Sequence, residues 1–355
     1  MIIGVPKESK IMEGRVGLIP SVCEALVKQG HEVVIETAAG LQSGYDDDHY
    51  RDAGAVIVDS AADVYLQARL IVKVKEPIDK DLPHIRSHHL LFCFLHLAAN
   101  QPLAEKLCDI GCTAIAFESV NHQGRRIILE PMSQIAGRLS VQIGSHLLHQ
   151  PMGGMGVLLG GIESTDPGHV VILGAGIAGH QAADVAACIG AKVTVFDIDK
   201  SKLAAISLLR GNIETQLSNT VAIEKAVKTA DLVVGAVLLP DKHTPRLVTE
   251  NMVKSMLKGS VVVDIAIDQG GCVETIRPTS YAEPTYRKHD VIHFGVTNMP
   301  GAVPRTASQA LSMAIQPYVE KLAKFDDIDN SELQAAINVK AGEIVLPALK
   351  TEFAD

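Results

Sequence analysis

The chain has 355 residues, of which 47% are hydrophobic and 21% charged, a composition typical of globular proteins at a length sufficient for two domains. Its formal net charge of -9, with no cluster of Lys and Arg along the sequence, argues against nucleic acid or an anionic membrane as a partner. No run of about 20 apolar residues is present, so the sequence predicts no membrane span.

The N-terminus and the cysteines both favour a soluble, cytoplasmic protein. The opening MIIGVPKESK has a short apolar run followed by charges, and it lacks the basic segment and long apolar stretch of a signal peptide. The six cysteines are scattered, and no two have the Cys-x-x-Cys spacing of a zinc or redox site. A chain of this length does not need disulfides for stability. We therefore expect reduced, mostly buried thiols.

The first part of the chain alternates short apolar runs with stretches of helical spacing. Strands are predicted at residues 2–5, 32–36, 56–59, 70–75, 90–95 and 113–118. Helices are predicted at residues 21–29 and 101–111, each with a glycine near its end. Because the strands are apolar throughout and alternate with helices, we expect a parallel sheet covered on both faces.

A long helix at residues 133–150, with Ser133 as its N-cap, separates this part from a second α/β region. A glycine-rich passage follows at residues 153–161, and strands are then predicted at 170–173, 192–196, 232–237, 260–266 and 291–296. The tail after Met299 is predicted to be mainly helical, most clearly at 306–322.

This order predicts an α/β protein in which a nucleotide-binding domain is inserted into a discontinuous one. Residues 1–130 form the first part of a doubly wound substrate domain, and residues 131–304 form a Rossmann domain that binds NAD. The helices of residues 305–355 are too few to form a domain alone, so we expect them to complete the substrate domain.

The sequence VVILGAGIAG, directly after an apolar run and at the start of a helix, predicts a dinucleotide-binding turn. Gly174 permits the tight turn, Gly176 lets a pyrophosphate approach the backbone, and Gly179 allows close packing of helix and strand. Asp197 follows about 18 residues after Gly179, at the end of the next strand, where a carboxylate binds ribose hydroxyls. Because that carboxylate would repel a 2′-phosphate, the sequence favours NAD over NADP.

Four residues that could perform chemistry lie after predicted strands, where open α/β sheets bind their ligands: Arg15, Lys75, His96 and Asp268. Histidine titrates near neutral pH and suits proton transfer, whereas arginine suits the bidentate binding of a carboxylate. For each of them a structural or solvated role is the alternative. Spacing alone does not choose between the neighbouring Lys73 and Lys75, of which one could pair with a carboxylate such as Glu76. It also does not choose between Asp264 and Asp268, since either could cap the backbone.

Two further features are weaker. His146 and His149 have a spacing that can bind metal, but no carboxylate or cysteine accompanies them, so we expect no metal there. Residues 298–301, with the sequence NMPG, form a predicted turn after the last strand of the nucleotide domain, where loops close over nicotinamide.

The motifs around these residues resemble the alanine dehydrogenase family. The similarity runs from Met1 to about Leu322 and is carried by the segments EGRVGLIP, IVKVKEP, FLHLA, EPMSQIAGRLSVQIG, VVVDIAIDQGGC, RPT and GVTNMPGAVPRTASQAL. The resemblance implies the reversible oxidative deamination of L-alanine by NAD to pyruvate, ammonia and NADH. It implies that Arg15 and Lys75 bind the substrate, that His96 is the general acid and base, and that Asp268 assists proton transfer.

The resemblance also implies the cofactor contacts, the metal content and the assembly. Beyond the three glycines, it assigns contacts with NAD to Ser133, Ile177, Ala178, Asp197, Lys202, Ser218, Val237, Leu238, Ile265, Ala266, Ile267, Asp268, Arg277, Val296, Thr297, Asn298 and Met299. Some members bind a metal through a Glu and a His, but the matching positions here are Lys321 and Phe325, so we expect none. Members of the family commonly form homohexamers.

Three alternatives stay open at this point. The NAD-binding subunit of the membrane transhydrogenase is similar and would be a binding module without substrate chemistry; Lys75, His96 and the IAIDQGG motif favour an amino-acid site instead. A related dehydrogenase for a larger amino or imino acid, such as a saccharopine-type enzyme, would differ in its pocket. An NAD-binding protein without catalysis would lack a catalytic residue, and all four are present.

Overall fold

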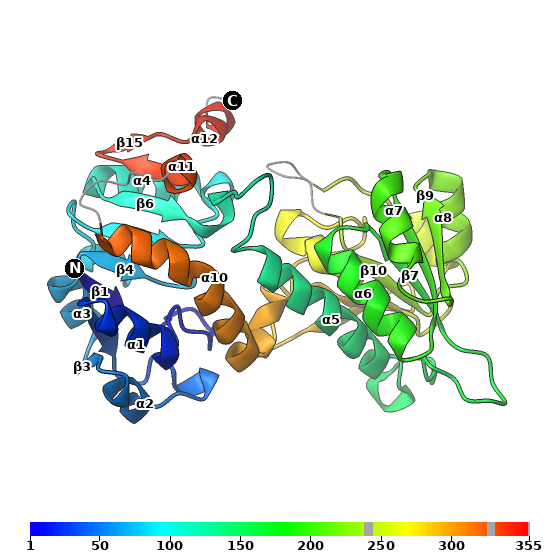
Figure 1. Ribbon diagram of the computed structural model, residues 1–355. Helices are drawn as coiled ribbons and strands as arrows, with labels where there is room; N and C mark the ends of the chain where they lie inside the picture. The colour runs from blue at the N-terminus through cyan, green and yellow to red at the C-terminus, as the bar shows by residue number, and fades with distance from the viewer. Residues whose placement is uncertain (238–243, 325–330, 354–355) are drawn as a thin grey trace. The chain divides into compact units, whose positions relative to one another are not determined.

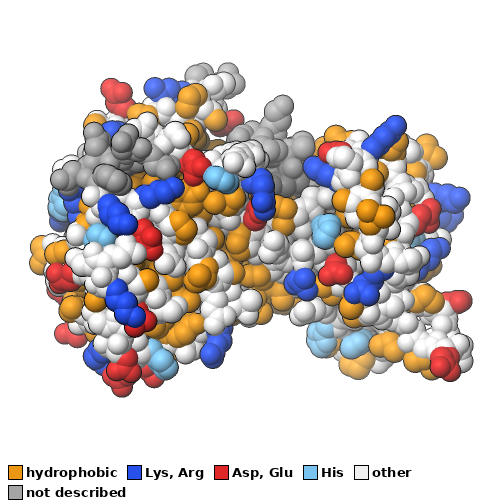
Figure 2. Space-filling model, viewed as in Figure 1, with side chains coloured by type: hydrophobic (Ala, Val, Ile, Leu, Met, Phe, Trp, Pro, Cys, Tyr) orange, Lys and Arg blue, Asp and Glu red, His pale blue; other side chains and the backbone are white. Residues whose placement is uncertain are grey.

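The computed structural model describes residues 1–237, 244–324 and 331–353, and it divides into two compact units. The first unit comprises Met1–Met132 and Gly301–Asp355, and the second comprises Ser133–Pro300. No helix among the described residues is long and apolar enough to cross a membrane. On the face drawn in Figure 2, acidic and basic side chains are interspersed.

The first unit is built on an eight-stranded sheet with the order β15-β14-β6-β5-β4-β1-β2-β3. Its strands are β1 (Ile2–Val5), β2 (Glu32–Glu36), β3 (Val56–Val58), β4 (Leu70–Val72), β5 (Leu90–Cys93), β6 (Thr113–Ala116), β14 (Ile337–Lys340) and β15 (Glu343–Ile344). The strands from β1 to β6 are parallel to their neighbours. Their order reverses between β1 and β4, which makes this the switch point of a doubly wound sheet.

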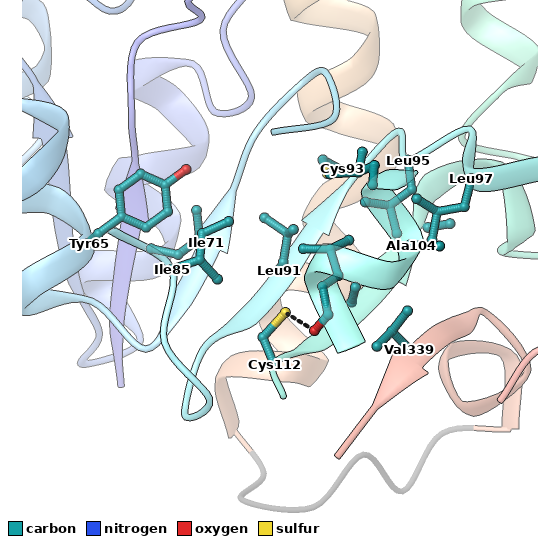
Figure 3. Close-up of a cluster of buried hydrophobic side chains, with 14 of the residues drawn as sticks. Tyr65, Ile71, Ile85, Leu91, Cys93, Leu95, Leu97, Ala104, Cys112 and Val339 are labelled. Atoms are coloured by element: carbon teal, nitrogen blue, oxygen red, sulfur yellow. Dashed lines mark hydrogen bonds between the residues drawn. The ribbon is translucent and has the colours of Figure 1, made fainter. Parts of the chain in front are cut away.

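Helices cover this sheet, and a buried apolar cluster lies under them. The helices are α1 (Pro20–Lys28), α2 (Asp47–Asp52), α3 (Ala61–Gln67), α4 (Gln101–Ile110), α10 (Pro304–Lys324), α11 (Ser331–Ala335) and α12 (Pro347–Glu352). The cluster joins side chains of β4 and β5 to α4 and to Val339 of β14. Figure 3 shows Leu95 and Leu97 at the same end of this cluster, so both neighbours of His96 are anchored in the core. All six cysteines are free thiols.

The described part of the tail is mainly helical, as predicted, but it also contains two strands that were not predicted. Strand β14 pairs antiparallel with β6 and β15 pairs with β14, which extends the sheet (Figure 1). These strands are short, and β15 has two residues, which is too few for a clear alternating pattern. The strand predicted at 70–75 ends at Val72, so Lys73 and Lys75 lie in the loop after β4.

The second unit is a seven-stranded sheet with the order β12-β13-β11-β10-β7-β8-β9. Its strands are β7 (His169–Leu173), β8 (Lys192–Asp197), β9 (Ile213–Leu217), β10 (Leu232–Gly235), β11 (Val261–Asp264), β12 (Thr285–Lys288) and β13 (Val291–Phe294). Only β12 is antiparallel to its neighbour. Numbered along the chain from β7 and omitting β12, the order is 3-2-1-4-5-6, the arrangement of dinucleotide-binding domains. This confirms the α/β, doubly wound fold class.

The helices of this unit are α6 (Ile177–Cys188), α7 (Lys200–Ser207), α8 (Thr220–Val227) and α9 (Glu250–Ser255), and most of α5 (Glu130–Leu147) also belongs to it. Figure 1 shows α6 against the sheet, where it packs on β7, β8 and β10. The expectation that Ser133 caps α5 is wrong, because the helix begins at Glu130. Pro131 accounts for the earlier start, since proline favours the first turn of a helix, where its missing N–H is not needed.

Candidate active site

The turn between β7 and α6 has the geometry that a dinucleotide requires. Gly174 has φ +104°, and a Cβ on it would lie 2.6 Å from the carbonyl oxygen of Ala236, after β10. A Cβ on Gly179 would lie 1.8 Å from the carbonyl oxygen of Gly174. On Gly176, by contrast, a Cβ would meet no atom within 4 Å, so the space over the first turn of α6 is open. A phosphate group fits this space and would meet the N–H groups at the start of the helix.

Asp197 lies at the end of β8, beside this turn. Its Oδ2 accepts the N–H of Ala175 at 2.6 Å, and its Oδ1 accepts the N–H of Asp199 at 2.8 Å. The N–H of Ser218, directly after β9, donates to the carbonyl of Asp197 at 2.9 Å. Asp197 and Ser218 thus lie together at the edge of the turn, each partly exposed, where both could contact a ribose.

Helix α5 approaches the same turn closely. A Cβ on Gly137 would lie 2.2 Å from the carbonyl oxygen of Ala178, so α5 packs directly on the first turn of α6. Ser133 is four residues before Gly137 and lies on the same face of α5. This places Ser133 toward Ile177 and Ala178, the two residues that begin α6.

The remaining predicted cofactor residues follow other strands of the second unit. Lys202 and Arg277 are exposed, and the guanidinium of Arg277 lies 4.5 Å from the ring centroid of Tyr286. Val237 follows β10 and is partly buried, whereas Leu238 lies outside the described residues. The segment after β13 is held in place because Tyr281 donates its hydroxyl to the carbonyl of Met299 at 2.8 Å. In that segment Val296 and Met299 are buried, Thr297 is exposed and Asn298 has φ 63°.

Asp264 and Asp268 have different surroundings. This difference shows which of them caps the backbone, a choice that spacing alone did not make. Asp264 is fully buried, and its carboxylate accepts the N–H groups of Ala266, Cys272 and Val273 at 2.8–3.1 Å. Asp264 is therefore the capping residue. Asp268 is exposed in the short 3-10 helix Ile265–Gln269, and its carboxylate makes no hydrogen bond or ion pair within the described part of the chain. Of the two, Asp268 is the one available for chemistry.

Arg15 is buried in the first unit and is oriented by Glu13. Its Nε and Nη2 donate to the Glu13 carboxylate at 2.7 and 2.6 Å, and Nη1 points to the sulfur of Met132 at 3.3 Å. A thioether is a weak acceptor, so a carboxylate ligand would be a stronger partner for Nη1 than Met132 is.

Lys73 and Lys75 also divide into a structural and an available residue. Lys73 is 1% exposed, with its Nζ 3.5 Å from both Glu8 and Asp81. Burial alone would lower the pKa of Lys73, but these carboxylates outweigh it and the pKa is raised, so Lys73 stays charged. Lys75 is half-buried and forms no ion pair with any described residue. Glu76, the carboxylate considered for pairing, binds Lys10 instead.

His96 stands out through its backbone. It has φ 49° and ψ 37°, a left-handed conformation that is uncommon for histidine and turns the exposed ring away from the core. Glu118, directly after β6, supports this turn by accepting the N–H of His96 at 2.6 Å, and its carboxylate lies 3.9 Å from Nδ1. The ring also stacks on Phe94. A strained residue held by a buried frame is typical of functional sites.

Three carboxylates that the sequence analysis missed hold the candidate residues. Glu13 orients Arg15, Glu118 supports His96, and Glu8 accepts the N–H of Val74 at 2.6 Å beside Lys75. Isolated acidic residues in loops carry no spacing signal, so the sequence alone did not distinguish them from surface acids. His146 and His149 contact each other edge to face, and no described group of three His, Cys, Asp or Glu side chains is arranged for a metal. Of the two positions compared for a metal, Lys321 lies 5.1 Å from the ring centroid of Tyr318, and Phe325 is not described.

Models of both domains of one protein family match the chain. The N-terminal domain of the alanine dehydrogenase/PNT family matches residues 4–136, and its C-terminal domain matches residues 140–347. The chain belongs to the alanine dehydrogenase/PNT family. Membership implies an oxidoreductase with a pyridine-nucleotide cofactor.

Relatives and solved structures agree with this assignment. Alanine dehydrogenase of Mycolicibacterium smegmatis is 48% identical over 91% of this chain and 88% of its own length. The Bacillus subtilis protein of the same name is 45% identical, covering 99% of this chain and 95% of its own. A solved L-alanine dehydrogenase superposes with a TM-score of 0.96 at 48% identity over 100% of this chain and 99% of its own. The solved structure of a transhydrogenase from Sinorhizobium meliloti superposes with a TM-score of 0.85. It is 26% identical and covers 98% of this chain and 100% of its own.

Proposed function

We propose that this chain is an NAD-dependent alanine dehydrogenase, which converts L-alanine, NAD and water to pyruvate, ammonia and NADH and also catalyses the reverse reaction. The observation that carries this proposal is the extent of identity with proteins of that name, 45–48% over nine-tenths or more of the chain. The two available cationic and basic side chains after β4 and β5, Lys75 and His96, support it, because an amino-acid substrate needs both charge recognition and proton transfer.

In the proposed mechanism Arg15 and Lys75 bind the substrate and fix its orientation. Arg15, which Glu13 orients through Nε and Nη2, would bind the substrate carboxylate through its guanidinium group. Lys75, which forms no ion pair with a carboxylate among the described residues, would bind the carboxylate and carbonyl oxygens of the substrate. Fixing both ends of a small substrate removes rotational freedom, which is a large part of the barrier to reaction.

His96 would transfer the protons. NAD, when bound over the turn of Gly174, Gly176 and Gly179, would supply the hydride acceptor for the alanine Cα–H, and oxidation of the unprotonated amine would give an iminium. Nε2 of His96 would accept a proton from water as water adds to this iminium, and the Glu118 carboxylate, 3.9 Å from Nδ1, would orient the ring. Asp268, unpaired among the described residues, would assist the proton transfer that releases ammonia. We also propose NAD rather than NADP, because Asp197 beside the turn would repel a 2′-phosphate.

The test is a panel of L-amino acids assayed for NADH formation, with pyruvate and ammonia in reverse, on the wild type and on His96→Asn. We expect activity with alanine and a loss of at least about a hundredfold in kcat for the variant, the range for removal of a general base. Turnover of His96→Asn close to that of the wild type would refute the mechanism.

The same assay tests the alternative hypothesis that the chain is an NAD-binding subunit of a transhydrogenase. Tight binding of NADH without turnover of any amino acid would favour an NAD-binding module. Activity with a larger amino acid only would favour a related dehydrogenase. The implied homohexamer is part of the proposal and can be measured by light scattering of the purified chain.

A further inference from the structure

The loop that carries Asp268, residues 265–273, is held by hydrogen bonds to the side chain of Asp264. The Oδ1 atom of Asp264 accepts the N–H of Ala266 at 3.0 Å, and Oδ2 accepts those of Cys272 and Val273 at 2.8 and 3.1 Å. Burial raises the pKa of Asp264 to about 6, so the carboxylate is still mostly ionised at neutral pH and its hydrogen bonds are charge-assisted. The start and the end of the loop are thus fastened to one buried side chain.

Arg246 also holds this loop, because its guanidinium donates hydrogen bonds to carbonyl groups of the loop backbone. Its Nη1 lies 2.7 Å from the carbonyl oxygen of Gly270, 2.9 Å from that of Gly271 and 3.0 Å from that of Val273. Gly270 and Gly271 have φ of +94° and +81°, a left-handed pair that lets both carbonyls face one donor. Arg246 forms no ion pair with a described carboxylate, and among the described residues its guanidinium binds these three carbonyls.

We propose that Arg246 is a positioning residue for the dehydrogenase reaction, which holds residues 265–273 so that Asp268 keeps its catalytic position. This inference rests on the proposed function. It follows from a contrast within the loop: the Asp268 side chain has no partner in the described chain, so its position depends on the backbone that carries it. That backbone is fixed by Asp264 and Arg246. Asp264 is fully buried, whereas Arg246 is exposed, so replacing Arg246 disturbs the packing of the unit less.

The experiment compares Arg246→Ala and Arg246→Lys with the control Arg287→Ala. Arg287 is an exposed arginine of the same unit that also donates to carbonyls, those of Gly153 and Asp290, away from the loop. We expect Arg246→Ala to lower kcat with L-alanine by about ten- to a hundredfold, the range for a displaced catalytic group. Arg246→Lys should retain part of the activity, guanidinium ions at millimolar concentration should restore part of it to Arg246→Ala, and Arg287→Ala should match the wild type.

Hydrogen exchange supplies a readout that does not depend on activity. In Arg246→Ala the amides of Cys272 and Val273 should exchange faster than in the wild type, while the melting temperature stays close to that of Arg287→Ala. A kcat within twofold of the wild type, or a lower kcat with unchanged exchange and no rescue, would overturn the proposal. If the wild type turns over no amino acid, the proposed function fails, and unchanged exchange at the two amides would then refute the anchoring role separately.

Discussion

The two units contain sheets with the same topology, but the residues at their switch points differ in kind. In each, six strands follow the order 3-2-1-4-5-6, with a switch point between β1 and β4 in the first unit and between β7 and β10 in the second. The second switch point is made of backbone, where Gly174 lies against the carbonyl of Ala236. The first is made of charged side chains, where Lys73 lies 3.5 Å from Glu8 and from Asp81. The same topology thus carries a glycine-rich backbone turn at one switch point and buried charged side chains at the other, so the fold alone does not determine what each site binds.

The largest effect is expected within the backbone-built site, from Gly179→Ala set against Gly176→Ala. The new Cβ of Gly179→Ala would lie 1.8 Å from a carbonyl oxygen, whereas that of Gly176→Ala would meet no atom within 4 Å. We expect Gly179→Ala to destabilise the second unit by about 3 kcal/mol or more, roughly 6–12 °C in melting temperature.

Gly176→Ala is the matched control for stability and has an effect of its own. Its melting temperature should equal that of the wild type, while its methyl group occupies the space over the first turn of α6. Affinity for NADH, measured by fluorescence titration, should fall by about ten- to a hundredfold. Unchanged NADH affinity would mean that the dinucleotide does not lie over this turn.

In the charged site, Lys73→Met and Lys75→Met should separate stability from activity. Lys73→Met leaves two buried carboxylates without their cation, which we expect to cost about 3–5 kcal/mol in chemical denaturation. Lys75→Met removes a half-buried lysine that forms no ion pair with a described residue, and it should change stability by less than about 0.5 kcal/mol. Its kcat/KM with alanine should nevertheless fall by about a hundredfold. If Lys75→Met instead kept full activity, the substrate would be bound elsewhere.

The comparison also explains what the sequence could predict. The proposed dinucleotide site depends on contiguous residues, and each strand, turn, glycine and terminal acid has a fixed place in the motif, so Gly174, Gly176, Gly179 and Asp197 could be predicted from spacing and physical chemistry. The fold class followed from apolar runs alternating with helices. The strands that were missed, such as β9 and β15, are half-exposed or very short and lack that apolar pattern.

The charged site could be predicted only in part, because its parts come from separate loops. Spacing placed Lys73 and Lys75 in the same segment, but the choice between them depends on Glu8, which is far away in the sequence, and on Asp81, which follows in the same loop region; both lie close to Lys73 in space. The left-handed conformation of His96 depends on Glu118 and on the buried Leu95 and Leu97. Such long-range contacts leave no local pattern, so the identity of the substrate rests on resemblance and not on residue chemistry alone.

The smallest effect is expected from removing one charge at the edge of the backbone-built site, in Asp197→Asn. The amide can still accept one of the two backbone N–H groups that Asp197 binds, but it no longer repels a 2′-phosphate. We expect the preference for NAD over NADP, measured as the ratio of kcat/KM values, to fall by about tenfold, which corresponds to roughly 1.4 kcal/mol. Asp199→Asn is the matched control, because it removes a charge two residues away, and asparagine keeps the cap that Asp199 provides for α7. An equal fall in both variants would show that the preference depends on the overall charge of this edge, whereas a fall confined to Asp197→Asn would assign the discrimination to that carboxylate.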